Sequence, residues 1–223
     1  MVLTWEPNAP FPGRFDAGTF PEGEREHVAK LEVLLFSLYR YILSFTAAIE
    51  LLKFSEEQRK KEREESKGTG FRPSKPYFEW SFIAVRDAAH TIYQFADAIE
   101  SIQSTRRMIP TLNALVKNDK MRTATRYFNA NFGQFNYVRN AIAHEAELGG
   151  TVEQSKRNFA PVGSVEFEGV KILTSKSIDT DGKFSTSING VVVSYELSRK
   201  TLQSLIRTQT GIYQAFADAY QQS

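Results

Sequence analysis

The chain has 223 residues, of which 41% are hydrophobic and 24% are charged, so it is long enough and apolar enough to bury a core. Its formal net charge of +2 argues against binding nucleic acid through a uniformly basic surface, although a local basic patch is compatible with that value. The absence of cysteine excludes disulfides, thiolate metal sites and cysteine nucleophiles.

The start of the chain is predicted to be an extended arm, because residues 1–21 contain four prolines. This arm has no basic segment followed by an apolar one, so it does not resemble a signal peptide, and we expect a cytoplasmic protein. The segment from Leu31 to Leu52 is apolar but carries Arg40 near its middle. An arginine at the centre of a membrane span costs about 2.5–3.5 kcal/mol, so we expect a buried amphipathic helix and no membrane contact.

Long helices are predicted over most of the first 148 residues. The first begins near Glu22, with acidic residues in its first turn, and runs into the charged block 56–66. That block is interpreted as a solvated helix end; the alternative, an arm that contacts RNA, is disfavoured because its acids balance its bases. After a loop at residues 68–76, further helices are predicted at about residues 77–108, 120–131 and 134–148.

The pattern changes between Val165 and Glu196, where apolar and polar residues alternate with a period of two. GVKILTSKSI, KFSTSI and VVVSYEL are predicted to form a three-stranded antiparallel meander. Its turns are placed at Asp181-Gly182 and Asn189-Gly190, whose residues tolerate positive φ. Ser198 is a suitable N-cap for a last helix, which is predicted at about residues 199–220.

These elements predict a mainly α protein with a small β-meander before its C-terminal helix. Residues 22–223 are expected to form a single domain, because the meander and the last helix are small for independent folding. Within that domain the helical bundle is predicted at residues 22–148, and the meander with the last helix at residues 165–220.

The segment RNAIAH, residues 139–144, lies on the helix predicted at 134–148 and carries the sharpest chemical signal. On one helix Asn140 and His144 are about 40° apart, whereas Arg139 and His144 are about 140° apart. Histidine can move a proton near neutral pH, and arginine offers a fork of donors that matches phosphate oxygens. The set would suit metal-free cleavage of a phosphodiester, with Asn140 orienting the imidazole or holding an oxygen. The residue chemistry alone favours the alternative, a buried histidine with a structural role.

The longer segment YVRNAIAHE resembles the motif of the HEPN superfamily (higher eukaryotes and prokaryotes nucleotide-binding domains). In that motif an Arg, often followed by Asn, Asp or His, precedes a His by a short spacer, as Arg139, Asn140 and His144 do. The match in context covers roughly residues 22–148. The resemblance implies a HEPN-like helical bundle that forms a homodimer, with two motifs facing each other in one composite cleft.

The resemblance also implies a function. Many members of the superfamily are metal-independent endoribonucleases, and by analogy His144 would act as general base or acid on the ribose 2′-hydroxyl. Arg139 would stabilise the charge on the phosphorane, Asn140 would support the geometry, and the products would carry cyclic phosphate ends. Our leading hypothesis is therefore an RNA-cleaving or RNA-binding protein of the toxin or antiviral-defence kind, with no cofactor.

Other members of the superfamily are inactive scaffolds or partners of a nucleotidyltransferase antitoxin. The alternative hypothesis is therefore a non-catalytic helical interaction module that keeps the motif for structural reasons. The expected partners under these readings are a second copy of the chain, RNA and a nucleotidyltransferase antitoxin. Residues 165–220 lie outside the typical pattern of the superfamily, so the resemblance does not indicate to which branch of the superfamily the chain would belong.

A second polar cluster, Arg86, Asp87 and His90, lies on the helix predicted at 77–108, with Arg86 and His90 on one face. If this helix packs beside the motif helix, the cluster would line the same cleft; the favoured interpretation is a polar cluster on the rim of the bundle. Three histidines without cysteines or close acidic spacing predict no metal site. The aromatic residues of segment 127–137 are expected to pack in the core or in a dimer interface rather than to stack on bases.

Overall fold

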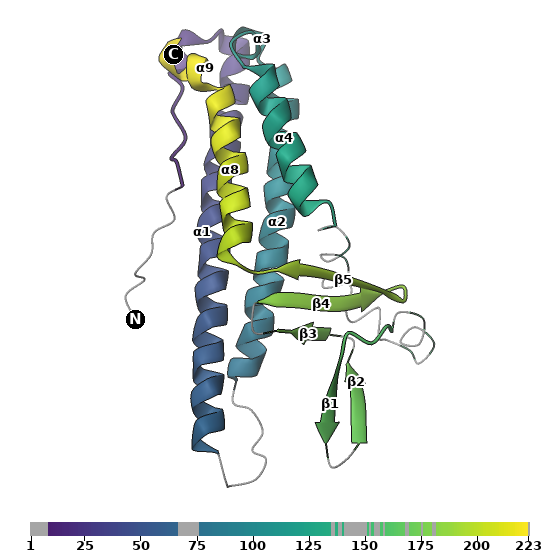
Figure 1. Ribbon diagram of the computed structural model, residues 1–223. Coiled ribbons are helices and arrows are strands. Elements are labelled where there is room, and N and C mark those ends of the chain that lie inside the picture. Colours follow the sequence, from purple (N-terminus) through teal and green to yellow (C-terminus); the bar gives the residue numbers. More distant parts are fainter. Residues whose placement is uncertain are drawn as a thin grey trace. The chain divides into compact units, whose positions relative to one another are not determined.

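The computed structural model describes residues 9–66, 76–134, 137, 140, 151, 153, 157, 159–167, 170–174, 176–179 and 182–222. The protein is mainly helical, with a three-stranded antiparallel sheet before its C-terminal helix, as the sequence predicts (Figure 1). The helices are α1 (Glu22–Glu65), α2 (Tyr77–Arg107), α3 (Pro110–Asn113), α4 (Asn118–Phe132), α8 (Arg199–Ala215) and α9 (Ala217–Gln222), with a short 3-10 turn η1 (Ala17–Thr19). The strands are β1 (Gly163–Phe167), β2 (Val170–Thr174), β3 (Lys176–Ile178), β4 (Lys183–Ile188) and β5 (Val191–Glu196).

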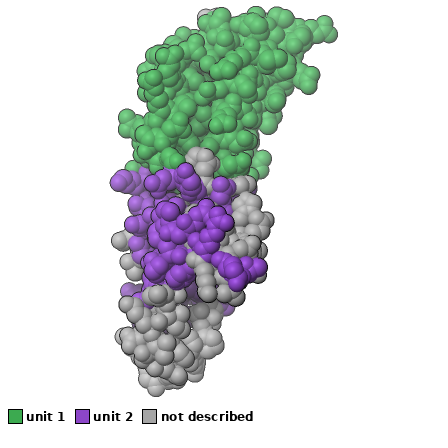
Figure 2. Space-filling view, turned by 90° about the vertical axis from the view of Figure 1, so that its right-hand side faces the viewer, with its two compact units in different colours: residues 1–46, 91–133, 202–223 green, residues 47–90, 134–201 purple. Residues whose placement is uncertain are grey.

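The chain divides into two compact units, which are coloured separately in Figure 2. Unit 1 comprises residues 1–46, 91–133 and 202–223, and unit 2 comprises residues 47–90 and 134–201. The long helices α1 and α2 contribute to both units. The expected single domain at residues 22–223 stays a prediction, and the units do not follow the predicted division between a bundle and a meander.

Unit 1 is a helical bundle built from segments of α1, α2, α4 and α8 (Figure 1). The rings of Phe95 on α2 and Phe128 on α4 stack with centroids 5.7 Å apart. The hydroxyl of Tyr213 on α8 donates a hydrogen bond of 2.8 Å to the carbonyl of Leu35 on α1. The predicted apolar stripe of α1 is fully buried in this unit at Leu31, Leu35, Leu38, Ile42 and Phe45.

Within unit 1, the described part of the N-terminal arm, residues 9–21, packs on α1 and α9. The Phe15 N–H donates to the Glu32 carboxylate at 2.8 Å, and the Phe15 ring stacks on Tyr220 with centroids 4.8 Å apart. Gly13 lies so close to the Tyr220 ring that a Cβ there would fall 2.5 Å from it. The predicted extended arm is interrupted by η1, which Asp16 caps by accepting a hydrogen bond from the Gly18 N–H.

The last helix differs from the prediction, because it breaks at Phe216 into α8 and α9. The carbonyl of Ala215 accepts a hydrogen bond from the Lys117 N–H at 2.9 Å, and the Phe216 N–H turns to the Tyr213 carbonyl three residues back. The side chain of Phe216 is fully buried. Tertiary packing therefore outweighs the continuous helical periodicity. The predicted N-cap is confirmed, since Ser198 Oγ accepts the Thr201 N–H at 3.3 Å.

Unit 2 contains both sheets. Strands β1 and β2 form an antiparallel pair, and β3, β4 and β5 form an antiparallel sheet in that order. The single strand predicted over residues 169–178 is therefore wrong: β2 pairs with β1, and β3 pairs with β4. The alternating pattern runs through both strands and does not distinguish their partners.

The two turns of the larger sheet differ in kind. Asn189 and Gly190 have φ values of 51° and 72°, as predicted for a two-residue turn between β4 and β5. The turn between β3 and β4 is longer than predicted, because the Gly182 N–H donates to the Asp179 carbonyl and the Asp179 N–H donates to the Lys183 carbonyl. Gly182 has a φ of 78°, the left-handed conformation typical of the glycine in a longer hairpin loop.

The sheet β3-β4-β5 packs on α2 within unit 2. The ring of Phe184 on β4 is 2% exposed and meets Phe82 on α2 edge-on, with centroids 6.4 Å apart. The hydroxyl of Tyr195 on β5 donates to the carbonyl of Val85 on α2. These contacts join the sheet to the same stretch of α2 that carries the second polar cluster.

By length and composition alone, α1 could cross a membrane: one of its 18-residue windows has a mean hydropathy of 1.4, and 39% of that window is buried within the protein. The core helix of a soluble protein can have the same length and hydropathy. The apolar stripe that is buried in unit 1 accounts for much of this apolar composition. The feature is weak evidence for a membrane span.

Candidate functional site

The RNAIAH segment lies mostly outside the described residues. Arg139 and His144 are not among them, so their relative geometry stays a prediction. Tyr137 and Asn140 are described, and both have helical backbone, which agrees at those two positions with the predicted helix 134–148. The side chain of Asn140 is exposed, and Tyr137 is 60% exposed. Asn140 therefore lies on a surface that a ligand could reach.

The aromatic residues that precede the motif have different roles. Phe128 and Phe132 are 2% and 7% exposed, and their rings lie 4.8 Å apart, which confirms the predicted packing role for these two. Tyr127 packs under the guanidinium of Arg207 at 4.6 Å from its ring centre. Phe135 lies outside the described residues. Only Tyr137 of the described members is exposed enough to offer a free ring face.

The second polar cluster is on the solvent side of α2. Arg86, Asp87 and His90 are all exposed, as expected for residues on a rim. Partial desolvation raises the pKa of Asp87 above its usual range, and the nearby His90 acts in the opposite direction. The structure therefore brings Asp87 and His90 together electrostatically. Whether they share a cleft with Arg139 and His144 stays a prediction.

Tyr195 joins this cluster from β5 and was not singled out from the sequence. Burial strongly raises the pKa of its hydroxyl, a hydrogen bond from the Ala89 backbone lowers it, and the charge of Asp87 raises it again. Because its hydroxyl also donates a hydrogen bond to the Val85 carbonyl, Tyr195 connects β5 to α2. The sequence does not predict this contact, because a tyrosine in an alternating strand gives no indication of a partner 110 positions away.

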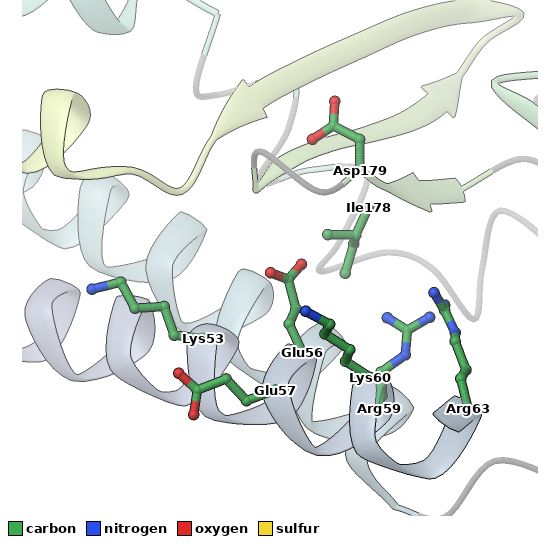
Figure 3. Close-up of a pocket in the computed structure, with 8 residues that line it drawn as sticks. All are labelled: Lys53, Glu56, Glu57, Arg59, Lys60, Arg63, Ile178 and Asp179. Carbon is green, nitrogen blue, oxygen red and sulfur yellow. The ribbon is translucent and has the colours of Figure 1, made fainter. Parts of the chain in front are cut away.

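A charged groove lies at the C-terminal end of α1, where the sequence predicted a solvated helix end. Two cavities of about 430 Å³ and 210 Å³ share Lys53 and Glu56 on their walls. The larger is lined by the charged face of α1 and by Ile178 and Asp179 from the sheet (Figure 3). The charged block is therefore opposed by β-structure over part of its length.

Among the described residues, no group of three or more His, Cys, Asp or Glu side chains is arranged to hold a metal ion. Comparisons with protein-family models, with curated proteins and with solved structures give no significant match. The resemblance to the HEPN superfamily therefore rests on the motif and its helical context.

Proposed function

We propose that the chain is a metal-independent endoribonuclease of the HEPN kind that acts as a homodimer. The observation that carries the proposal is the segment Arg139-Asn140-Ala141-Ile142-Ala143-His144 in a mainly helical chain. The exposed, helical Asn140 supports it, because a residue that holds substrate must be accessible. The exposed cluster on α2 offers a second set of polar groups of the types used in phosphodiester chemistry.

The proposed reaction needs no group beyond the side chains of the motif. His144 takes the proton from the ribose 2′-hydroxyl, and the 2′-oxygen attacks phosphorus while the bond to the 5′-oxygen breaks. Arg139 balances the additional negative charge on the phosphorane. The departing 5′-oxygen takes up a proton from water, and protonated His144 returns its proton to water, which leaves a 2′,3′-cyclic phosphate and a 5′-hydroxyl end.

The helix geometry motivates the dimer. Arg139 and His144 would project about 140° apart on one straight helix, so one motif does not direct both side chains at the same phosphate. Two motifs that face each other would place the arginine of one subunit beside the histidine of the other. The proposed cleft is therefore composite.

An exposed apolar stripe on α1 supports the formation of a protein interface. Val33, Phe36 and Leu43 are 65%, 39% and 40% exposed, and Phe11 packs on Phe36 with ring centroids 5.5 Å apart. Grouped apolar residues of this kind mark protein contacts. The stripe is compatible with the homodimer, and it also favours the second candidate function, a non-catalytic interaction module.

Cleavage of a mixed RNA pool in the presence of EDTA tests the proposal. The wild type should produce fragments with cyclic phosphate ends, and His144→Ala should abolish them. His27→Ala, which alters a histidine far from the motif in sequence, is the matched control and should cleave like the wild type. A folded, dimeric wild type that leaves every RNA in the pool intact would contradict the nuclease and favour the interaction module.

Mixing two inactive variants tests the composite cleft. A heterodimer of Arg139→Ala and His144→Ala subunits retains one pair of intact Arg and His side chains only if the pair is formed across subunits. Activity should then return in the mixture, while each variant alone stays inactive. No recovery in a mixture that is shown to exchange subunits would mean that the two residues act within one chain.

A further inference from the structure

The buried stripe of α1 in unit 2 ends in charged residues at positions where the helical spacing would continue the core. Ile49 and Leu52 are buried at 3% and 4% exposure. The next positions on the same face, at steps of four, three and four residues, are Glu56, Arg59 and Arg63. A helix face that only needed a core partner would carry apolar residues there. The change from apolar to charged residues indicates a polar ligand or solvent opposite this end of α1.

The charged face borders an open cavity. The cavity has a volume of about 430 Å³, within the range of small-ligand sites. Figure 3 shows Arg59 and Arg63 extending from α1 with their guanidinium groups on the side that faces Ile178. The carboxylate of Asp179 points away from α1 in the same view, and it accepts a hydrogen bond from the Lys183 N–H at 2.8 Å. That acid is therefore engaged in its own hairpin turn.

The electrostatics of Arg59 favour an anion in this cavity. Desolvation is the largest influence on Arg59 and lowers its pKa, the like charge of Arg63 lowers it further, and Glu56 and Glu62 raise it. Like charges four residues apart on a helix repel each other. Lys53 is paired with Glu50 at 2.9 Å, whereas Lys60 adds a further exposed cation to the wall. A phosphate between the two guanidinium groups would offset both the repulsion and the lost hydration.

An aromatic ring lies beside this pair of arginines. The guanidinium carbon of Arg59 lies 5.0 Å from the centre of the Phe78 ring, and Phe78 is 38% exposed. This cation–π contact restricts the position of the guanidinium group, which limits the loss of side-chain entropy on binding. Exposed aromatic rings next to basic side chains are the usual combination in sites for single-stranded nucleic acid.

The cavity is also lined by the acids Glu56 and Glu57, so the site is the basic part of its wall and not the whole groove. From these observations we propose that this basic part, formed by Lys53, Arg59, Lys60 and Arg63, binds phosphate groups of a single-stranded RNA, with Arg59 and Arg63 as the principal contacts. The identity of the polyanion as RNA rests on the proposed function, whereas the phosphate site rests on the groove itself. The groove would contribute affinity rather than chemistry.

Binding of a 2′-O-methyl oligonucleotide tests the site without interference from cleavage, because this strand has no free 2′-hydroxyl to attack the phosphate. Affinity for a fluorescein-labelled strand is measured by anisotropy at several salt concentrations, for the wild type and for Arg59→Met/Arg63→Met. The matched control is Arg122→Met/Arg126→Met, which removes two exposed arginines at the same spacing on α4. Circular dichroism confirms that each variant is folded.

The groove variant should bind at least about tenfold more weakly than the wild type, since the loss of even one of its two charged contacts is worth about that factor. The slope of log affinity against log salt should become shallower by about 1.4, the value expected when two phosphates of a single strand are no longer neutralised by the protein. The control variant should retain both the affinity and the slope. Arg59→Lys/Arg63→Lys should retain the slope while losing part of the affinity, because lysine keeps the charge without the planar fork of donors.

Equal losses in the groove and control variants would overturn the proposal, and so would an unchanged salt slope in the groove variant. Titration with inorganic phosphate and with a nucleoside monophosphate separates a strand site from a site for a free anion. Tight phosphate binding without oligonucleotide binding would overturn the assignment to RNA. Because the oligonucleotide cannot be cleaved, loss of nuclease activity and loss of this site are scored in separate experiments.

Discussion

The hydroxyl of Tyr195 on β5 donates a hydrogen bond to the main-chain carbonyl of Val85 on α2, across 110 positions of the sequence. The bond joins the sheet of unit 2 to the helix that carries Arg86, Asp87 and His90. It couples the position of the β-meander to the polar cluster.

Tyr195→Phe should destabilise the protein by about 1 kcal/mol, because it removes one partly buried hydrogen bond and leaves the ring in place. Urea denaturation followed by circular dichroism gives the change in the free energy of unfolding. Tyr127→Phe is a suitable comparison, since the Tyr127 hydroxyl makes a longer contact of 3.4 Å with Ser204 and should matter less. Equal stabilities of Tyr195→Phe and the wild type would show that the bond contributes nothing net.

At neutral pH, Tyr220→Phe should not lower the free energy of unfolding, in contrast to Tyr195→Phe. Among the described residues, the Tyr220 hydroxyl is buried without a hydrogen-bond partner. Removing an unsatisfied hydroxyl should leave the stability unchanged or raise it by up to about 1 kcal/mol. A clear loss of stability in the same denaturation experiment would mean that the hydroxyl has a partner in solution.

The two tyrosines should behave alike at alkaline pH. Burial raises the pKa of both hydroxyls above the usual value of 10.0. A raised pKa contributes stability that is fully present below pH 10 and is lost as the pH rises through the folded-state pKa. Each phenylalanine variant should therefore lose stability less steeply than the wild type above pH 10, by up to about 1.4 kcal/mol per pH unit. Parallel curves for variant and wild type would contradict the burial of that hydroxyl.

The long helices could be predicted from the sequence because their stability comes from a local pattern. Leu31, Leu35 and Leu38 recur at steps of four and three residues, and all three are fully buried. The split of the first predicted strand into β2 and β3 could not be predicted, because pairing partners are chosen by tertiary contacts. The same holds for the break at Phe216, where the Lys117 N–H takes the Ala215 carbonyl.

The candidate sites likewise differ in whether their residues are close together in the sequence. The Arg139–His144 segment was recognisable because its residues are adjacent in sequence, and the cluster at Arg86 because its members share a helix face. The groove at Arg59 was not recognisable, because a block of balanced charge is compatible with solvent on every side. The cavity is formed only because Ile178 and Asp179 lie opposite this block, and these residues are more than a hundred positions further along the chain.

Gly182→Ala should cost about 2 kcal/mol or more, because the residue has positive φ and lies against the main chain. Its φ is 78°, and a Cβ there would lie 2.7 Å from the Leu197 carbonyl oxygen. Gly23→Ala is the matched control, since a Cβ at Gly23 meets nothing within 4 Å and the residue is helical. Thermal unfolding should show a lower midpoint for the first variant and an equal or higher one for the second. Equal midpoints for Gly182→Ala and the wild type would show that the turn can rearrange.

Asp87→Asn should stabilise the protein at neutral pH. Desolvation raises the pKa of Asp87, so the folded state favours the protonated carboxyl. The protonated Asp87 carboxyl contributes stability that is fully present below its pKa in the unfolded chain. This contribution is lost as the pH rises through its pKa in the folded protein. The advantage of the asparagine variant should therefore be absent at pH 3 and present at pH 7, as measured by urea denaturation at both values. A variant that is less stable at pH 7 would mean that the pairing with His90 outweighs the desolvation.

Asn140→Ala separates a role in function from a role in structure. Because the Asn140 side chain is exposed, its removal should change the free energy of unfolding by less than about 0.5 kcal/mol. If Asn140 supports the geometry of the motif, the same variant should cleave RNA at least about tenfold more slowly than the wild type. Asn129→Ala alters another exposed asparagine, on α4, and should change neither quantity. A loss of stability without a specific loss of cleavage would show that the motif is kept for packing, which is what the interaction module requires and the nuclease does not.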